Sequence, residues 1–228
     1  MKTKNMKTTI ASLALTSLAT CVASAAVVVT TGHQSNGTNN FTHTYVVSST
    51  DLINGLTPTT VVGDFPAGSG TGSQAVLNDG LMPATLDTFP FSGFTGGGTS
   101  EGTRLIYTLP TPASIASIDV YGGWADTGRD DQNYSVFYAT SLDPTTFVFL
   151  QTVNFNPTPG GRVVSKSTIS ENVTGILATD VKALRFDFLT HVNNWAGYAE
   201  IDVNAVPEPS AALLGGLGLL GLLIRRRK

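Results

Sequence analysis

Apolar and polar residues alternate through the second half of the chain. Leu105, Tyr107 and Leu109 would share one face of an extended segment, and Ile118 with Val120 repeats the pattern. A period of two predicts β-strands that bury one face in a core. The strands predicted in this way span residues 103–109, 115–121, 134–139, 147–155, 162–169, 181–189 and 197–203.

Turn-forming residues separate these predicted strands. They are Pro110-Thr111-Pro112, Gly122-Gly123, Asp143-Pro144, residues 157–161, Gly175 and Asn193-Asn194. The looser, glycine-rich stretch over residues 36–102 predicts only weak strands, at 42–48, 61–62 and 75–77. Short strands without a helical period predict an all-β fold, an antiparallel β-sandwich or jelly roll.

The N-terminus has the features of an export signal. Residues 1–7 carry three lysines and no acid, and residues 10–22 form an apolar stretch. The small residues Ala23 and Ala25 fit signal peptidase, so cleavage is expected before Ala26. A signal helix should therefore precede the β domain.

Cys21 is the only cysteine of the 228 residues. The sequence Leu18-Ala19-Thr20-Cys21 approximates a lipid-attachment signal, and the alternative is that Cys21 is removed with the signal peptide. Under either outcome the exported body has no cysteine for a disulfide or a thiolate metal site.

The C-terminus carries three features in order. Val206-Pro207-Glu208-Pro209 comes first, and an apolar stretch follows at residues 211–224. As a helix those 14 residues would span ~21 Å, less than the ~30 Å of a bilayer's hydrocarbon core. A short transmembrane helix is predicted there, and the chain ends on Arg225, Arg226, Arg227 and Lys228.

These three features resemble the PEP-CTERM sorting signal of Gram-negative bacteria. The resemblance implies processing by an exosortase in the inner membrane, followed by a location on the outer surface or in the extracellular matrix. It also implies an association with extracellular polysaccharide. The predicted organisation is a signal peptide (1–25), a Gly/Thr-rich part of the β domain (26–72), a galactose-binding-like sandwich (73–205) and the sorting signal (206–228).

Composition changes once the two terminal signals are set aside. The whole chain has a net charge of −3, but residues 26–206 hold 6 basic and 15 acidic residues, a net charge of −9. Such a field repels nucleic acid and anionic lipid, and it attracts at most divalent cations or neutral, hydroxyl-rich ligands. The alternative is that the charge only keeps an exported protein soluble.

The order of features from about residue 73 to 203 resembles the discoidin or galactose-binding-like jelly roll. The residues that carry it are Leu77-Asn78-Asp79-Gly80, Ile118-Asp119-Val120-Tyr121, Arg129, residues 132–136, 147–153 and 184–188, and the closing run at 197–203. The cysteine pair that usually joins the ends of extracellular discoidin domains is missing.

Two predicted loops combine tryptophan with polar side chains. Aromatic rings stack on sugar rings while carboxylate, amide and guanidinium groups bind hydroxyls, so these loops predict a carbohydrate site. Its candidate residues are Trp124, Asp126, Arg129 and Asp130 from the first loop, with Asn193, Asn194, Trp195 and Tyr198 from the second. The alternative is that the tryptophans cover the ends of the core.

Calcium is the only cofactor that the sequence suggests. Asn78 and Asp79 offer oxygen ligands, although Asp-Gly is also a turn signal. No nucleophile motif is present, and Glu200 with Asp202 is the only hint of paired carboxylates. We expect these two acids to face solvent, and the protein not to be an enzyme.

The sequence therefore predicts an exported surface protein whose sandwich binds exopolysaccharide. The alternatives are a structural matrix protein without a small ligand and, more remotely, an ice-binding protein or a glycoside hydrolase. The expected partners are signal peptidase, an exosortase, polysaccharide and, before processing, the membrane.

Overall fold

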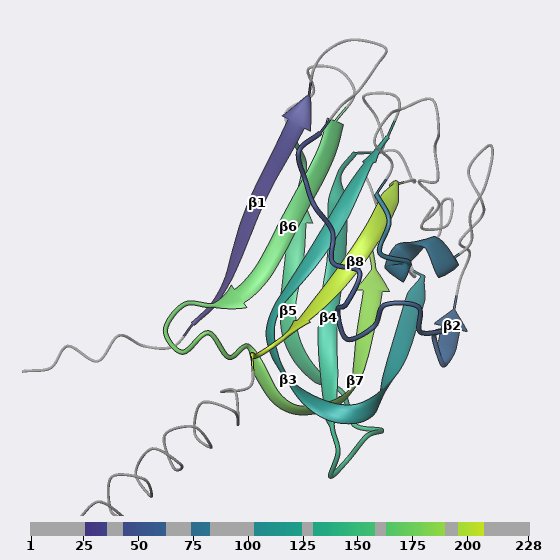
Figure 1. The fold of residues 1–228 in the computed structure, drawn as a ribbon, viewed down its shortest axis with the longest axis vertical. Helices are drawn as coiled ribbons and strands as arrows, with labels where there is room; N and C mark the ends of the chain where they lie inside the picture. The colour runs from purple at the N-terminus through teal and green to yellow at the C-terminus, as the bar shows by residue number, and fades with distance from the viewer. Residues whose placement is uncertain are drawn as a thin grey trace, which may run out of the picture.

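The computed structural model describes residues 26–35, 43–62, 74–82, 103–124, 130–157, 163–189 and 196–207. They form an antiparallel sandwich with one short 3₁₀ helix, η1 (Figure 1). The elements in chain order are β1 (Val27–Ser35), β2 (Thr60–Val62), η1 (Gln74–Asn78), β3 (Arg104–Trp124), β4 (Gln132–Thr140), β5 (Val148–Phe155), β6 (Val163–Glu171), β7 (Ala178–Phe188) and β8 (Tyr198–Ala205).

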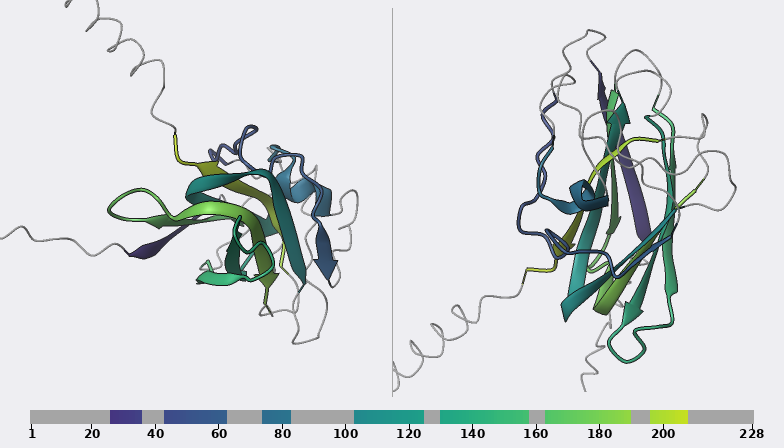
Figure 2. Two further views of the ribbon diagram at one scale, coloured as in Figure 1. Left: turned by 90° about the horizontal axis from the view of Figure 1, so that it is seen from below. Right: turned by 90° about the vertical axis from the view of Figure 1, so that its right-hand side faces the viewer.

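The long strand β3 belongs to both layers. Its first half pairs with β2 and β7, and its second half pairs with β6 and β8. One layer is therefore β1-β6-β3-β8 and the other is β2-β3-β7-β4-β5. Figure 1 shows β3 curving through the lower end of the molecule, and Figure 2 shows the layers from two further sides.

The bend of β3 lies where a turn was expected. Pro110-Thr111-Pro112 is inside the strand, so the predicted turn is wrong. Thr108 pairs with Ala183 while Ala113 pairs with Val181, which is a large bulge. Proline has no N–H for the ladder, and bulges let a strand change direction, so the same residues that suggest a turn here bend a continuous strand.

The turn predicted at Gly122-Gly123 is also wrong, because both glycines lie within β3. Gly123 adopts φ 150° and donates its N–H to the Gly197 carbonyl at 2.9 Å. A Cβ at this position would lie 2.3 Å from the Val163 carbonyl oxygen. Glycine is needed here because the backbones of β3, β6 and the segment before β8 approach closely.

The core lies between the layers, as the alternation predicts. Leu105, Tyr107 and Leu109 are at most 1% exposed, and Ile118 and Val120 are fully buried. The predicted strands of the second half of the chain are all present. Strand β1 had no predicted counterpart, residues 43–48 form no strand, and residues 75–77 lie in η1 instead of a strand.

Strand β8 is covered on both of its faces. Ala199, Ile201 and Val203 are buried as predicted, but Glu200 and Asp202 are buried too, with exposures of 0% and 2%. The expectation that these two acids face solvent is therefore wrong. The physical reason is that residues 43–56 and η1 pack over the second face of β8.

No helix in the described part of the chain is long and apolar enough to cross a membrane. The expected signal helix and C-terminal helix lie outside the described residues.

Candidate metal centre and ligand loops

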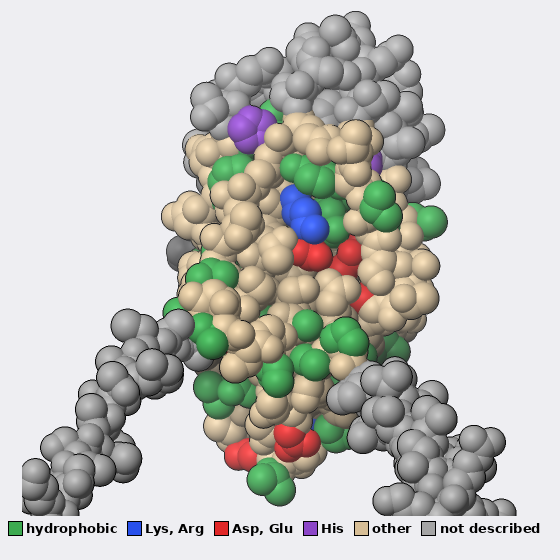
Figure 3. All heavy atoms as spheres, turned by 60° about the vertical axis from the view of Figure 1, so that its left-hand side comes forward, with side chains coloured by type: hydrophobic (Ala, Val, Ile, Leu, Met, Phe, Trp, Pro, Cys, Tyr) green, Lys and Arg blue, Asp and Glu red, His purple; other side chains and the backbone are tan. Residues whose placement is uncertain are grey.

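Three carboxylates meet under the segment that covers β8. Asp51, Glu200 and Asp202 each place one oxygen within 4.8 Å of the other two. Asp51 comes from the covering segment and the two others from β8, so residues about 150 positions apart form one cluster. On the face of the molecule drawn in Figure 3, acidic side chains (red) lie next to a basic side chain (blue).

Backbone N–H groups hold one oxygen of each carboxylate. Asp202 Oδ2 accepts from Ser48 N–H at 2.8 Å, and Glu200 Oε1 accepts from Gly80 N–H at 3.1 Å. Asp51 Oδ1 accepts from the N–H groups of Ile53 and Val203 at 3.0 and 3.1 Å. The orientation of all three groups is therefore fixed by the backbone.

The second oxygen of each carboxylate is buried and has no hydrogen-bond partner among the described residues. These oxygens are Asp51 Oδ2, Glu200 Oε2 and Asp202 Oδ1, and the Tyr107 hydroxyl is in the same condition. Buried polar atoms are nearly always satisfied, and unpaired buried charges cost several kcal/mol. Such a set fits a bound cation.

Burial and mutual repulsion raise the pKa values of the carboxylates in this cluster. Burial first, and then repulsion from Asp202, Asp79 and Asp51, raises the pKa of Glu200 to about 9. Burial and the neighbouring charges of Asp51 and Asp119 raise the pKa of Asp202 to about 6. Oxygen-only ligands of this charge suit a hard divalent ion such as Ca²⁺ better than Zn²⁺.

The predicted metal ligands lie beside this cluster. The Asn78 side chain is buried and donates to the Ile53 and Leu56 carbonyls, which fastens the covering segment. Asp79 accepts from Leu81 N–H at 2.9 Å, and its charge helps to raise the pKa of Glu200. The sequence analysis missed Asp51, and it named Glu200 and Asp202 only as a possible carboxylate pair that faces solvent. Acids at alternate positions between buried apolar residues of β8 are the signal that could have pointed to the cluster.

The metal-free protein should lose stability as the pH rises from 5 to 9. An unfolded glutamate titrates near ~4.3, whereas Glu200 in the fold titrates at about 9. Between these values the folded state binds more protons than the unfolded state, so unfolding becomes easier as pH increases. Thermal melts in chelator test this, and Glu200→Gln should flatten the slope. A melting temperature that rises over this range would contradict the argument.

The segments that flank the two predicted sugar loops are hydrogen-bonded to each other. Gly123 N–H donates to the Gly197 carbonyl at 2.9 Å, and Leu189 N–H donates to the Asn133 carbonyl at 2.8 Å. Gly122 is paired with Tyr198. The bases of both loops therefore adjoin at the end of the sandwich where β3 ends and β8 begins (Figure 1).

The predicted sugar-binding residues are described only in part. Asp130 is 4% exposed and Tyr198 is fully buried, its hydroxyl accepting from Asn133 N–H at 3.0 Å. Neither side chain presents a surface to a ligand. Trp124 ends β3 with its backbone paired to Val163, and its side chain lies outside the described part. Also outside it are Asp126, Arg129, Asn193, Asn194 and Trp195.

The terminal signals extend beyond the described residues as well. Ala26, Val206 and Pro207 are described, whereas Ala23, Ala25, Glu208, Pro209, Arg225, Arg226 and Arg227 are not. The body is an antiparallel β-sandwich with a carboxylate cluster under one covering segment. Residues 205–228 match the PEP-CTERM protein-sorting motif, which confirms the resemblance of the tail. The motif marks an exported protein that is sorted to the cell envelope or surface.

No curated protein matches the chain. Solved structures to which it is similar include a chitosan-binding module of a chitosanase/glucanase from Paenibacillus sp. IK-5, at 15% identity over 68% of this chain and 99% of that one, with a TM-score of 0.42. A family 32 carbohydrate-binding module from Clostridium perfringens, in complex with GalNAc-β-1,3-galactose, is 14% identical over 64% of this chain and 93% of that one, with a TM-score of 0.43.

A third similar structure holds two such modules and the M60 catalytic domain of Clostridium perfringens ZmpB, at 19% identity and a TM-score of 0.33. That match covers 46% of this chain and spans only 10% of the other. At these identities the similarity concerns the fold alone.

Proposed function

We propose that this protein is a non-catalytic, carbohydrate-binding surface protein with a structural calcium ion. The proposal rests on the contact between the bases of the two loops. Gly123 is hydrogen-bonded to Gly197, and Leu189 is hydrogen-bonded to Asn133. Tryptophan and polar side chains of both loops would then line one cleft. Extracellular polysaccharide is the proposed ligand, because the protein is exported to the surface and the acidic body disfavours anionic ligands.

The calcium ion would stabilise the fold and would take no part in a reaction. Asp51, Glu200 and Asp202 would hold it through the oxygens that lack partners. The ion supplies positive charge that compensates the buried carboxylates. Because Asp51 lies on the covering segment and the others on β8, the occupied site would fasten residues 43–56 to the sandwich.

Loss of both tryptophans should weaken polysaccharide binding strongly. Trp124→Ala with Trp195→Ala removes both proposed stacking surfaces, and aromatic anchors each contribute on the order of 2 kcal/mol, so affinity should fall by roughly 10² to 10³-fold. Affinity electrophoresis in the host's own exopolysaccharide measures the change. The matched control is Phe149→Ala, which removes a 54% exposed aromatic side chain from β5.

Two results would decide against the proposal. Binding that survives the double substitution would remove the loops as the site. A wild-type protein that binds no host polysaccharide and no sugar on a glycan array would favour a structural matrix protein without a small ligand.

A further inference from the structure

The sorting motif begins without a free linker. Strand β8 ends at Ala205, which is paired with Ile115, and Val206 N–H donates to the Ser114 carbonyl at 2.9 Å. The backbone at the start of the motif is thus hydrogen-bonded to the bend of β3. The processing enzyme meets this segment attached to the folded domain.

Both ends of the domain lie at the same end of the sandwich. Ala26 N–H donates to Asn172 Oδ1 at 3.0 Å, in the turn between β6 and β7, and Leu177 of that turn donates to Ile115 at 2.8 Å. Figure 1 shows β1 starting and β8 ending close together on the lower left of the domain. Only residues 208–210 separate Pro207 from the apolar stretch 211–224, a reach of at most ~13 Å. While that stretch is in the membrane, this end faces the membrane.

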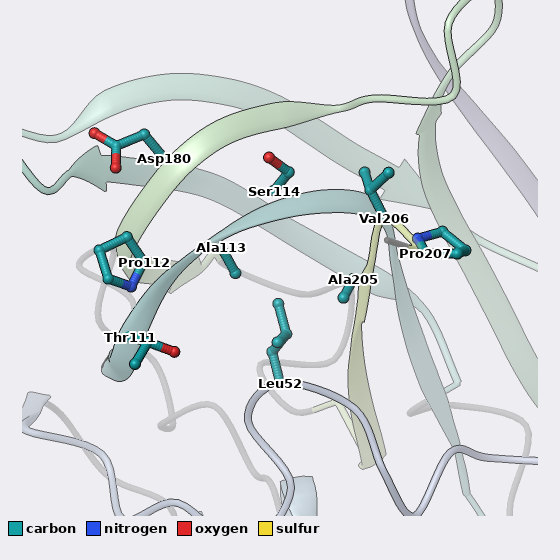
Figure 4. A pocket seen from close by; sticks show the side chains of 9 residues that line it. All are labelled: Leu52, Thr111, Pro112, Ala113, Ser114, Asp180, Ala205, Val206 and Pro207. Atoms are coloured by element: carbon teal, nitrogen blue, oxygen red, sulfur yellow. The ribbon is translucent and has the colours of Figure 1, made fainter. Parts of the chain in front are cut away.

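A pocket of about 660 Å³ opens at this end, and the sorting motif forms part of its wall. Leu52 from the covering segment extends toward Ala113 of β3 and Ala205 of β8, with Val206 and Pro207 beside them (Figure 4). Thr111, Pro112, Ser114 and Asp180 complete the lining.

The lining is mainly apolar with one fixed charge. Among the residues that line the pocket only Asp180 is charged. The Ser141 hydroxyl lies 2.8 Å from its Oδ1 and 2.7 Å from its Oδ2, and the two oxygens share the one proton that this hydroxyl donates. An apolar side chain with a neighbouring cation complements such a surface.

From this arrangement we propose that the pocket is a docking site for the membrane enzyme that processes the sorting motif. The enzyme would insert an apolar side chain, flanked by a basic one, between Leu52 and Pro207. The inference rests on the sorting part of the proposed function. Its physical basis is that Pro207 belongs both to the motif and to the pocket lining, so an enzyme that binds the motif also contacts the rim of the pocket. The motif would then be read together with the folded domain.

The test follows processing of the full-length precursor in the host, by pulse-chase and the change in mass. Thr111→Trp places a large side chain at the exposed rim and should slow processing about tenfold, the effect of losing one well-packed contact. Thr31→Trp, at an exposed position of β1, is the matched control and should leave the rate unchanged. Melting temperatures of the purified variants verify that both fold.

A second variant keeps the test decisive if Thr111→Trp does not fold. A Gly-Ser-Gly-Ser insertion between Ala205 and Val206 keeps Val206-Pro207-Glu208-Pro209 intact but separates it from the pocket, and it should also slow processing about tenfold. Wild-type rates for the folded pocket variants, the insertion included, would overturn docking. The double variant Pro207→Ala with Glu208→Ala separates the two hypotheses. Normal processing of this variant refutes the sorting assignment itself. If its processing is blocked while the pocket variants are processed at the wild-type rate, only the docking site is refuted.

Discussion

Addition of Ca²⁺ to the metal-free protein should raise its melting temperature by about 5 to 10 °C. An ion at ~100 times its dissociation constant stabilises the folded state by ~2.7 kcal/mol, and each kcal/mol corresponds to ~2–4 °C in a domain of this size. The reason for the expected effect is that three buried carboxylate oxygens have no hydrogen-bond partner among the described residues, and a bound cation would compensate their charge. Differential scanning calorimetry after chelation, with and without Ca²⁺ at pH 8, measures the shift.

Substitutions in the cluster should remove the shift selectively. Asp202→Asn keeps an acceptor for Ser48 N–H but removes the charge that would face the ion, so the calcium response should fall to near zero. Asp143→Asn is the matched control, because Asp143 is exposed in the β4–β5 turn and accepts only from Thr145 and Thr146. An equal calcium response in both variants would mean that the ion binds elsewhere.

Gly123→Ala should destabilise the sandwich strongly. Its Cβ would overlap the Val163 carbonyl oxygen at 2.3 Å, and φ 150° is unfavourable for any L side chain. Backbone strain and overpacking together suggest a loss of roughly 3 to 5 kcal/mol, a large part of the stability of a typical domain. Denaturant unfolding monitored by tyrosine and tryptophan fluorescence measures it.

Gly32→Ala provides the comparison. A Cβ at Gly32 would meet only the Tyr45 hydroxyl, at an ordinary 3.5 Å, so the free energy of unfolding should change by less than ~1 kcal/mol. If the two alanine variants are equally stable, the close approach of β3, β6 and the segment before β8 is not as described.

Much of the fold can be predicted from the sequence because alternation is a local property. Leu105, Tyr107 and Leu109 predict the buried face of β3 correctly, and Ile201 and Val203 lie in the core as predicted. Ala199 is buried too, but it lies at a register shift and packs in a second cluster with Tyr121 and Val164. Alternation cannot tell whether another segment covers the opposite face. That is why Glu200 and Asp202 were expected in solvent: the covering segment has no periodic pattern, and Asp51 lies far away in the sequence.

Local signals also fail where their meaning depends on the partner strand. Pro110 and Pro112 indicate a break in the ladder, which is correct, but only the pairing of β3 with two layers decides that the chain bends and does not turn back. Asn78-Asp79-Gly80 pointed to the neighbourhood of the cluster without identifying its central carboxylates. The aromatic residues proposed for sugar binding stay a prediction from sequence.

The most direct test of the metal centre is the number of Ca²⁺ ions bound by the purified exported protein. Isothermal titration of chelator-treated protein at pH 8 should give one ion per chain for the wild type and none at the same concentrations for Asp51→Asn with Asp202→Asn. No binding by the correctly folded wild type, or one ion still bound by the double variant, would contradict a calcium site at Asp51, Glu200 and Asp202.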